Sequence, residues 1–394
     1  MSDCFTAFRR VRGAAADELF VLCRPTDGAA SVARQSEAAY SALLELLSGQ
    51  GVGPDAVVRE TLFFRRIRQD FSVVIDARFR VLGKAGLPAC RAAMTCIEQP
   101  PLSDEACFEL AVVAQLPHPE QSWSLTEVDT APSCSCRQCT GGARANVVRL
   151  GEQTSVHAGD IRGSGNGVFE QTGNMFRAAE GLLHEAGMSF RDVIRTWIYL
   201  RDIDRDYDDL NRARREFFDR CGLERRPAST GVQGAAFADA HDVSMGLYAV
   251  KSSQPLQVTL MSTTTLNEAW TYGADFSRGL RIVDANKTAL YVSGTASIDE
   301  TGQSVHVGDF AGQADRMLRN ITSLLAAQGA SFRDIVSAVT YLKHPGDAPA
   351  LREIFRNRGF DGFPSTLVAA PLCRPELLCE AEALAIVAPP RSGG

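Results

Sequence analysis

The stretch QTGNMFRAAEGLLHEAGMSFRDVIRTWIYLRDI, residues 171–203, is repeated in outline as QADRMLRNITSLLAAQGASFRDIVSAVTYLKHP at residues 313–345. Each begins with Gln, continues with apolar residues at helical spacing, and breaks at Gly187 or Gly329, which is suited to end a helix. Each then repeats Ser-Phe-Arg-Asp and enters a β-branched, aromatic segment that ends in Tyr-Leu. The pattern predicts a helix followed by a strand at both places.

A third, more diverged copy is QSEAAYSALLELLSGQGVGPDAVVRETLFFRRI at residues 35–67. After each copy come a second amphipathic helix, a proline-containing turn and a closing apolar strand. The turns are LPACRA, RPASTG and FPSTLV, and the closing strands are CFELAVVAQ, VSMGLYAVK and EAEALAIVA. Three such units in order predict an α/β (α+β) fold in which each unit is a small mixed sheet covered on one face by two helices.

The boundaries between units are predicted from composition. TAPSCSCRQCTGGARA, near residues 130–146, is loop-like, and KSSQPL at 251–256 is a short polar break. The expected domains are therefore residues 1–130, 146–252 and 256–390, a division that suits a chain of 394 residues.

Composition excludes several classes of function. A net charge of −6 argues against general binding to a nucleic-acid backbone, which requires clustered Lys and Arg. No apolar run reaches the 18–20 residues that span a bilayer, and the first residues, MSDCFTAFRRVRG, lack the apolar stretch of a secretory signal. The 11 cysteines are scattered, so we expect reduced thiols and a cytoplasmic protein.

The repeated unit resembles the RidA/YjgF family, small proteins that form homotrimers with a pocket at each subunit interface. Three copies in one chain would imitate that trimer as a monomer with pseudo-threefold symmetry, which is the arrangement of the chorismatases. The segments most similar to chorismatases are YGADFSRG (272–279), YVSGTASI (291–298) and CRPELLCEAEA (373–383). This resemblance implies chorismate as the small-molecule substrate, an active site between the central and C-terminal units, and no metal or organic cofactor.

Comparing the copies gives a test of function, because a residue that the fold requires should recur in all three. The strand after the first helix of each unit carries Arg59, Arg195 and Ser337 at equivalent places. An Arg within VIRTWIYL is costly to bury without a partner or an anionic ligand. We expect Arg195 to hold a substrate carboxylate; the alternatives are a structural ion pair or a solvent-facing edge position.

The closing strand of the third unit carries two carboxylates, Glu380 and Glu382, which we count as equivalent to Val243 and Met245. Residues at i and i+2 of a strand share one face. A carboxyl in a pocket has its pKa raised by desolvation and becomes a candidate general acid. The alternative is an exposed pair on an edge strand. The chorismatase resemblance favours Glu380 as the catalytic acid, with Glu382 supporting the site or the fold.

The resemblance also fits the chemistry of chorismate, which carries two carboxylates and an enolpyruvyl ether. Protonation of the terminal methylene carbon would start release of pyruvate. Further candidates for substrate binding are Arg278, Arg374, Tyr272 and Gly294. Cys373 resembles the branch that makes 3-hydroxybenzoate, where a thiol beside the ring would assist an arene-oxide-like intermediate; its alternative is a buried structural thiol. The same resemblance marks Ala296 as a second candidate position for distinguishing the branches.

Other functions stay open. The other chorismatase branch hydrolyses chorismate to 3,4-dihydroxycyclohexa-1,5-diene carboxylate. A RidA-like imine or enamine deaminase would use an Arg shortly after the turn proline, where these turns read Pro-Ala-Ser-Thr and Pro-Ser-Thr. A non-catalytic protein that binds a small acid is the third alternative. Cys134, Cys136 and Cys139 lack a fourth ligand nearby, so we expect unpaired loop thiols rather than zinc.

Overall fold

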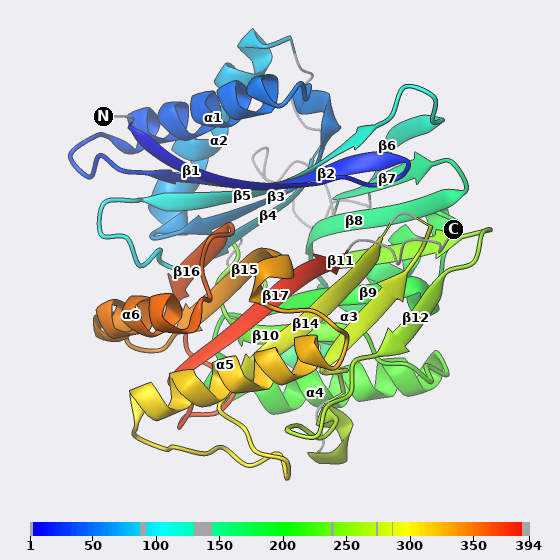
Figure 1. Cartoon of the computed structure of the whole chain (residues 1–394), viewed down its shortest axis with the longest axis vertical. Helices are drawn as coiled ribbons and strands as arrows, with labels where there is room; N and C mark the ends of the chain where they lie inside the picture. Colours follow the sequence, from blue (N-terminus) through cyan, green and yellow to red (C-terminus); the bar gives the residue numbers. More distant parts are fainter. Residues whose placement is uncertain are drawn as a thin grey trace.

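The computed structural model describes residues 3–86, 92–129, 144–237, 240–272, 275–285 and 287–387. The strands of these residues form three mixed sheets of five, six and six strands. Figure 1 shows the helices on the outside of the molecule and the three sheets turned toward its middle. This is the three-unit α/β architecture that the repeats predict. Among the described residues, no helix is both long and apolar enough to cross a membrane.

The N-terminal sheet has the order β1-β2-β5-β3-β4 and is covered by two helices. Its elements are β1 (Cys4–Val11), β2 (Ala16–Pro25), α1 (Val32–Gly49), β3 (Val57–Phe64), α2 (Ile67–Lys84), β4 (Ala93–Glu98) and β5 (Phe108–Pro117), with a short 3-10 helix at Pro54–Ala56. The turn LPACRA lies mostly outside the described residues.

The central sheet has the order β10-β9-β11-β8-β7-β6. Its elements are β6 (Trp123–Asp129), β7 (Arg144–Leu150), β8 (Gln153–Ile161), α3 (Val168–Glu185), β9 (Val193–Leu200), α4 (Ile203–Arg220), β10 (Ala228–Gln233) and β11 (Val243–Ser252). Because β6 pairs with β7, a strand from within residues 1–130 completes the central sheet rather than the N-terminal one.

The C-terminal sheet has the order β12-β13-β14-β17-β15-β16. Its elements are β12 (Gln257–Leu260), β13 (Gly279–Val283), β14 (Thr288–Ala296), α5 (Phe310–Ala326), β15 (Ile335–Leu342), α6 (Ala348–Arg358), β16 (Ser365–Ala369) and β17 (Cys379–Val387). In every sheet the closing strand (β5, β11 or β17) lies in the interior between two antiparallel neighbours.

The Gln that begins each repeat has the same structural task in all three units. The side-chain amides of Gln35, Gln171 and Gln313 donate to a backbone carbonyl of the segment before the closing strand, and their Oε1 atoms accept from a backbone N–H two residues further on, at 2.8–2.9 Å. Each Gln is buried, so these bonds also satisfy its own polar atoms. The residue recurs because the fold requires it.

The Ser-Phe-Arg-Asp motif forms a 3-10 turn with a capping box, once at Ser189–Asp192 and once at Ser331–Asp334. The Ser hydroxyl caps the turn, and the Asp carboxylate accepts the Ser backbone N–H at 2.8 Å. The preceding Gly187 and Gly329 have φ of 72° and 73°, in the left-handed region where glycine ends a helix without strain. The strand that follows therefore starts at the same place in both units.

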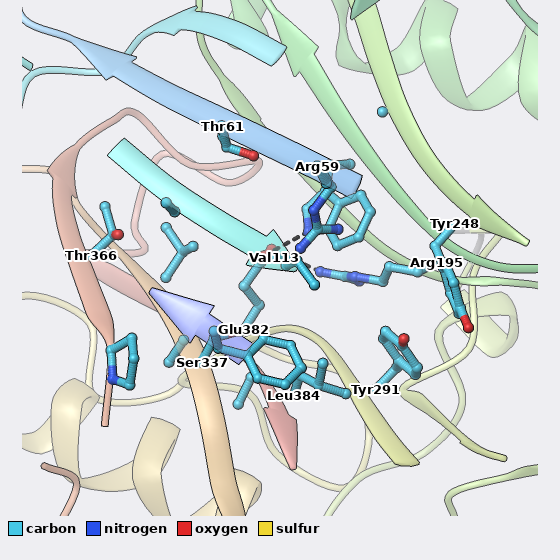
Figure 2. A pocket seen from close by; sticks show the side chains of 18 of the residues that line it. Arg59, Thr61, Val113, Arg195, Tyr248, Tyr291, Ser337, Thr366, Glu382 and Leu384 are labelled. Atoms are coloured by element: carbon cyan, nitrogen blue, oxygen red, sulfur yellow. Dashed lines mark hydrogen bonds and ion pairs between the residues drawn. The ribbon is translucent and has the colours of Figure 1, made fainter. Parts of the chain in front are cut away.

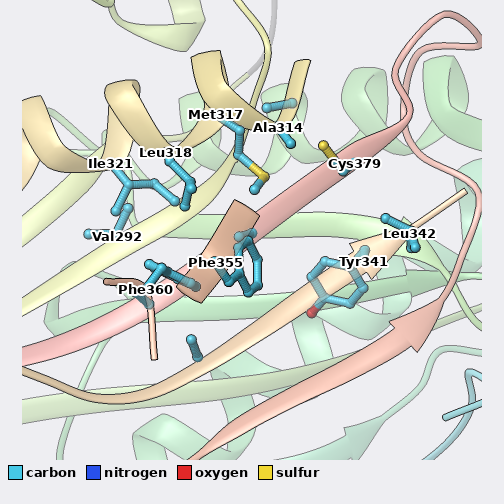
Figure 3. Close-up of a cluster of buried hydrophobic side chains, with 14 of the residues drawn as sticks. Val292, Ala314, Met317, Leu318, Ile321, Tyr341, Leu342, Phe355, Phe360 and Cys379 are labelled. Carbon is cyan, nitrogen blue, oxygen red and sulfur yellow. The ribbon is translucent and has the colours of Figure 1, made fainter. Parts of the chain in front are cut away.

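The C-terminal core lies between α5, α6 and the sheet (Figure 3). One face of β17 packs against the helices, where Cys379 contacts Met317 and Ile321 of α5 and Phe355 of α6 in the same buried cluster. Successive side chains of a strand point to opposite faces. Cys379, Ala381 and Ala383 face the helices, so Glu380 and Glu382 face the other way. The two glutamates share a face, as their spacing predicts.

Candidate active site

A pocket of about 460 Å³ lies between the central and C-terminal units. The central unit supplies α4 and β10, and the C-terminal unit supplies β14 and the segments before β13 and β17. Its lining residues are Tyr207, Asp208, Asn211, Arg212, Arg215, Ser229, Gly231, Phe276, Arg278, Gly294, Ala296, Ile298, Cys373, Arg374, Leu377 and Glu380. Five of the residues predicted for the site therefore line one pocket: Glu380, Cys373, Arg278, Arg374 and Gly294.

Glu380 supplies the acidic group of this pocket. It stands on β17 opposite Tyr341 and is only 5% exposed. Burial, and then the nearby carboxylate of Glu382, raise the pKa of Glu380 from 4.5 to about 8, against the opposing effect of Arg278. Among the described residues, its carboxyl has no hydrogen-bond or ion-pair partner. Glu380 therefore carries a proton at neutral pH and is free to donate it.

Gly294 allows the Glu380 carboxyl to lie against the strand. It lies in a β-bulge of β14, between Val292 and Thr295, rather than in a turn. A Cβ atom on Gly294 would overlap Glu380 Oε1 and would come within 3.0 Å of Thr230 Cγ2. The Gly294 N–H donates to Thr230 Oγ1 at 2.9 Å, which ties the bulge to the central unit.

Four arginines give the pocket its positive charge. Arg278 is 2% exposed and its Nε donates to the carbonyl of Asn267 at 2.9 Å. Arg374 Nη1 donates to the Gly302 carbonyl at 2.8 Å and to Ser304 at 3.1 Å. Arg212 and Arg215 reach the pocket from the exposed face of α4. The arrangement suits a substrate with more than one carboxylate.

Arg212 and Arg215 were missed by the sequence analysis. The helix IDRDYDDLNRARREFFDR is so rich in charge that each residue looks like part of a solvated face. Only the packing of α4 against the C-terminal unit distinguishes these two. In the structure, Arg215 is paired with buried Asp275 of the C-terminal unit, with an Nε–Oδ2 distance of 2.9 Å between residues 60 positions apart in the sequence.

Cys373 lies in the pocket as an un-ionised thiol. Burial, and then the charge of Glu380, raise the pKa of Cys373 to about 12, while a hydrogen bond with Tyr207 acts in the opposite direction. A thiolate nucleophile is therefore disfavoured at this position. The group can still act as a weak hydrogen-bond partner and can limit the shape of the pocket.

Arg195 does not line this pocket, which corrects the expected location. It is 1% exposed, and its Nη2 donates to Glu382 Oε2 at 2.7 Å and to Thr230 Oγ1. Glu382 also accepts from Trp197 Nε1 at 2.7 Å and from the Tyr341 hydroxyl at 3.2 Å. Arg195 and Glu382 instead line a second cavity, to which residues of all three units contribute (Figure 2).

The expected equivalence of the closing strands was wrong by one residue. Glu380 pairs with Tyr341 as Ser244 pairs with Tyr199 and as Glu109 pairs with Phe63. Glu380 therefore corresponds to Ser244, not Val243, and Glu382 corresponds to Gly246, not Met245. The N-terminal unit also carries a glutamate, Glu109, at the position of Glu380.

The difference between the two glutamates lies on the neighbouring strand. Ala296 pairs with Glu380, whereas the residue beside Glu109 is Arg24, whose guanidinium lies 3.6 Å from the Glu109 carboxylate. In the central unit the corresponding residue is Arg162, which follows Ile161, the partner of Met245. The small Ala296 leaves space beside Glu380 that an arginine takes in the other units.

Two of the predicted features lie at or beyond the edges of the described ranges. The backbone of Tyr272 ends a 3-10 turn at Ala269–Tyr272, but its side chain lies outside the described part of the structure. Cys134, Cys136 and Cys139 also lie outside it. Within the described ranges, no three His, Cys, Asp or Glu side chains are grouped to hold a metal ion.

A family model places the chain in a known class: it belongs to the family described as Endoribonuclease L-PSP, whose model matches residues 146–251 and 272–387. A 3-hydroxybenzoate synthase from Streptomyces hygroscopicus is 30% identical over 227 residues, which cover 51% of this chain and 65% of that protein, slightly under two thirds of its length. The 3-aminoacrylate deaminase RutC from Acinetobacter baylyi is 31% identical over 99 residues, covering 25% of this chain and 79% of that protein.

A crystal structure of a chorismatase superposes with a TM-score of 0.61 at 17% sequence identity, covering 84% of this chain and 94% of that one. At this identity the match concerns the fold. The comparisons confirm the predicted resemblance to RidA-like units and to the three-unit chorismatase architecture.

Proposed function

We propose that this protein is a chorismatase that cleaves chorismate to pyruvate and 3-hydroxybenzoate. The observation that carries the proposal is Glu380, a buried carboxyl with a pKa of about 8 in a pocket ringed by arginines. An acid that is protonated at neutral pH and surrounded by cations suits a dianionic substrate whose cleavage begins with proton transfer to carbon. The similarity to a 3-hydroxybenzoate synthase supports the same activity.

In the proposed mechanism, Glu380 donates its proton to the terminal methylene carbon of the enolpyruvyl ether, which creates an oxocarbenium ion at the ether carbon. The ring hydroxyl then attacks the adjacent ring carbon, the C–O bond to the side chain breaks, and pyruvate leaves. Opening of the resulting epoxide and rearrangement of a ring hydrogen give the aromatic acid. The hydroxyl proton returns to Glu380, so no net water is consumed, whereas hydrolysis to the dihydrodiol consumes one water.

Binding is assigned to the cations of the pocket. Arg278 and Arg374 lie on the C-terminal wall and Arg212 and Arg215 on the α4 wall, so the ring carboxylate and the carboxylate of the enolpyruvyl side chain would meet arginines from different walls. Ala296 leaves the space for the ring, and Gly294 lets the acid approach it. Tyr272 stays a proposed substrate contact.

We assign Cys373 to product choice. Its un-ionised thiol beside Glu380 would favour ring opening to 3-hydroxybenzoate by excluding the water needed for hydrolysis.

We further propose that the chain acts as a cytoplasmic monomer in which residues 1–130, 146–252 and 256–390 replace the subunits of a trimer. β6 then links the first unit to the second sheet.

A deaminase is the second candidate, supported by the similarity to RutC over a quarter of the chain. Ser229, two residues after the turn Pro227, lines the pocket where the deaminase pattern expects an arginine nearby. The positive charge comes from other elements. This weighs against deamination.

The deciding experiment incubates purified protein with chorismate, follows pyruvate with a lactate dehydrogenase couple, and identifies the ring product by chromatography. The proposal predicts equal amounts of pyruvate and 3-hydroxybenzoate. Absence of pyruvate above background would overturn it, and a dihydrodiol product would overturn only the branch assignment.

Matched variants sharpen this experiment. Glu380→Gln is expected to abolish turnover, whereas Glu109→Gln, at the equivalent position of the N-terminal unit, is expected to leave it unchanged. Cys373→Ala is expected to change the product ratio more than the rate of pyruvate release. Equal loss of activity in both Glu→Gln variants would show that Glu380 is not the acid.

A further inference from the structure

A second cavity of about 100 Å³ lies near the middle of the molecule, where strands of all three sheets meet. β2, β3 and β5 come from the N-terminal unit, β8, β9 and β11 from the central unit, and β14, β15 and β17 from the C-terminal unit. We call it the axial cavity. It shares no lining residue with the candidate active site.

Positive charge exceeds negative charge in the axial cavity. Its lining includes the cations Arg59, Arg195 and Lys287 and the carboxylates Glu18 and Glu382. Lys287 pairs with Glu18, and Arg195 pairs with Glu382. Arg59 is the cation left over.

Arg59 has no hydrogen bond or ion pair with another described residue. Its guanidinium stacks on the indole of Trp197, 4.4 Å from the ring centroid. Burial lowers the pKa of Arg59 below its ordinary value, which reflects the cost of keeping this charge out of water. Figure 2 shows Arg59 and Arg195 projecting into the same space from two different strands.

Arg195 also has unused hydrogen-bonding capacity. Its Nη2 is engaged, but its Nη1 is buried without a partner among the described residues. His157, another lining residue, does not supply negative charge, because burial and the nearby Arg59 and Lys287 lower its pKa to about 3 and keep it neutral. The site therefore has two guanidinium donors and one unmatched positive charge.

We propose that the axial cavity binds a small monocarboxylate between Arg59 and the free Nη1 of Arg195. A planar carboxylate matches the fork of N–H donors on a guanidinium, and a single negative charge neutralises the excess. The volume corresponds to roughly three water molecules, which limits the ligand to about the size of formate, acetate or pyruvate. Chorismate and aromatic acids are too large.

The axial cavity is connected to the candidate active site through a hydrogen-bonded residue, Thr230, that lies between them. Thr230 Oγ1 accepts from Arg195 and from the N–H of Gly294, and Glu382, the partner of Arg195, lies two residues from Glu380. A carboxylate held on Arg195 would thus act on the groups that position the acid. This part of the inference rests on the proposed function, but the binding itself does not.

The test titrates the full chain, in a low-anion buffer at constant ionic strength, with formate, acetate and pyruvate in separate arms and with sodium chloride as the reference. Binding is read from calorimetry and tryptophan fluorescence, without any activity assay. The expected result is one saturable carboxylate site per chain. Chloride with the same affinity would overturn the carboxylate assignment, and absence of a saturable site would overturn the proposal.

Two substitutions of different kinds test whether the carboxylate binds in the axial cavity. Arg59→Met removes the unmatched charge, and Ser337→Leu keeps both arginines but fills the cavity that Ser337 lines. Each is expected to weaken binding roughly tenfold or more. Arg278→Met, in the active-site pocket, is the control and is expected to bind as the unsubstituted protein does. Circular dichroism and Tm without ligand verify folding.

Other outcomes are equally clear. Binding that is lost in Arg278→Met but kept in both axial variants would place the carboxylate in the active-site pocket and overturn the proposal. Because this readout needs no turnover, failure of the chorismate experiment leaves the result intact.

Discussion

Glu380 is the residue proposed as the catalytic acid, and its protonation gives the first prediction. Because its pKa is raised to about 8, the acid form predominates at pH 6–7 and is lost as the pH rises through 8. Under the proposed function, kcat/KM for chorismate should fall about tenfold per pH unit above that value. A pH–rate profile checks this, and a rate that stays constant to pH 10 would contradict the assignment of Glu380.

The same shift predicts how stability depends on pH. The unfolded carboxyl releases its proton near 4.5 and the folded one near 8, so between these values the folded state holds more protons. The free energy of unfolding therefore falls as the pH rises from 4.5 to 8. Glu380→Gln should remove this contribution, on the order of 2–4 kcal/mol. Urea unfolding of both proteins at pH 5 and 8 measures it; equal pH dependence would contradict the raised pKa.

Gly294 is expected to be intolerant of any side chain. In Gly294→Ala the new Cβ would overlap the Glu380 carboxyl and move it away from the substrate. A displacement of about 1 Å at a reacting group can lower kcat roughly 100-fold. Steady-state kinetics with chorismate should show this loss of kcat, while the Tm of the variant should change only slightly. Full activity in Gly294→Ala would show that the carboxyl does not need its present position.

At the scale of the elements, the hydrogen bonds of the buried side chains of Gln171 and Gln313 allow an effect on stability to be distinguished from an effect on activity. Replacing either by Leu leaves backbone groups without partners and should lower the free energy of unfolding by about 2–4 kcal/mol. Of the two, only Gln313 is hydrogen-bonded to a segment that lines the pocket, residues 373–378. Gln313→Leu should therefore reduce activity as well, whereas Gln171→Leu should reduce stability alone. Matched urea unfolding and pyruvate assays distinguish the two effects.

The elements themselves were largely predictable from the sequence, because helical spacing, glycine at helix ends and β-branched strands are local signals. The register was not. Counting from the turn prolines fails because Val243 lies 16 residues after Pro227, whereas its true equivalent, Cys379, lies 15 residues after Pro364. The connecting loop can gain a residue without disturbing either strand. Hydrogen bonding between strands, which the sequence does not display, fixes which glutamate faces which neighbour.

For the whole molecule, the contrast between Glu109 and Glu380 yields a further prediction. Arg24 lies beside Glu109, whose pKa burial raises to about 7. In Arg24→Ala, the buried carboxylate loses its counter-charge, so stability should fall by about 1–3 kcal/mol at pH 8 and by less at pH 6, where Glu109 is protonated.

A second substitution provides the control for this effect. Adding Glu109→Gln to Arg24→Ala should remove the additional loss at pH 8, as measured by urea unfolding of the single and double variants. If the double variant were as pH-dependent as Arg24→Ala, the cause would lie elsewhere.

The candidate site was predictable where its residues lie in the three segments that resemble chorismatases, which supplied Arg278 and Gly294 as well as the C-terminal group. Glu380, Cys373 and Arg374 lie within eight residues, and the sequence pattern identified them together. Arg212 and Arg215 line the site because α4 of the central unit packs against the C-terminal unit. Arg195 does not line it, because its guanidinium pairs with Glu382 at the axial cavity. Such contacts between distant segments have no local sequence signal.

Because the three units are joined in one polypeptide, a single substitution alters one interface between units rather than all three. In a homotrimer, a substitution that opens one interface opens all three, and a substitution that closes one closes all. Here Ala296 can stay small while Arg24 and Arg162 stay large, since each is encoded separately. Under the proposed function, only one of the three interfaces has to hold substrate, and the residues of the other two can be selected for the stability of the chain instead.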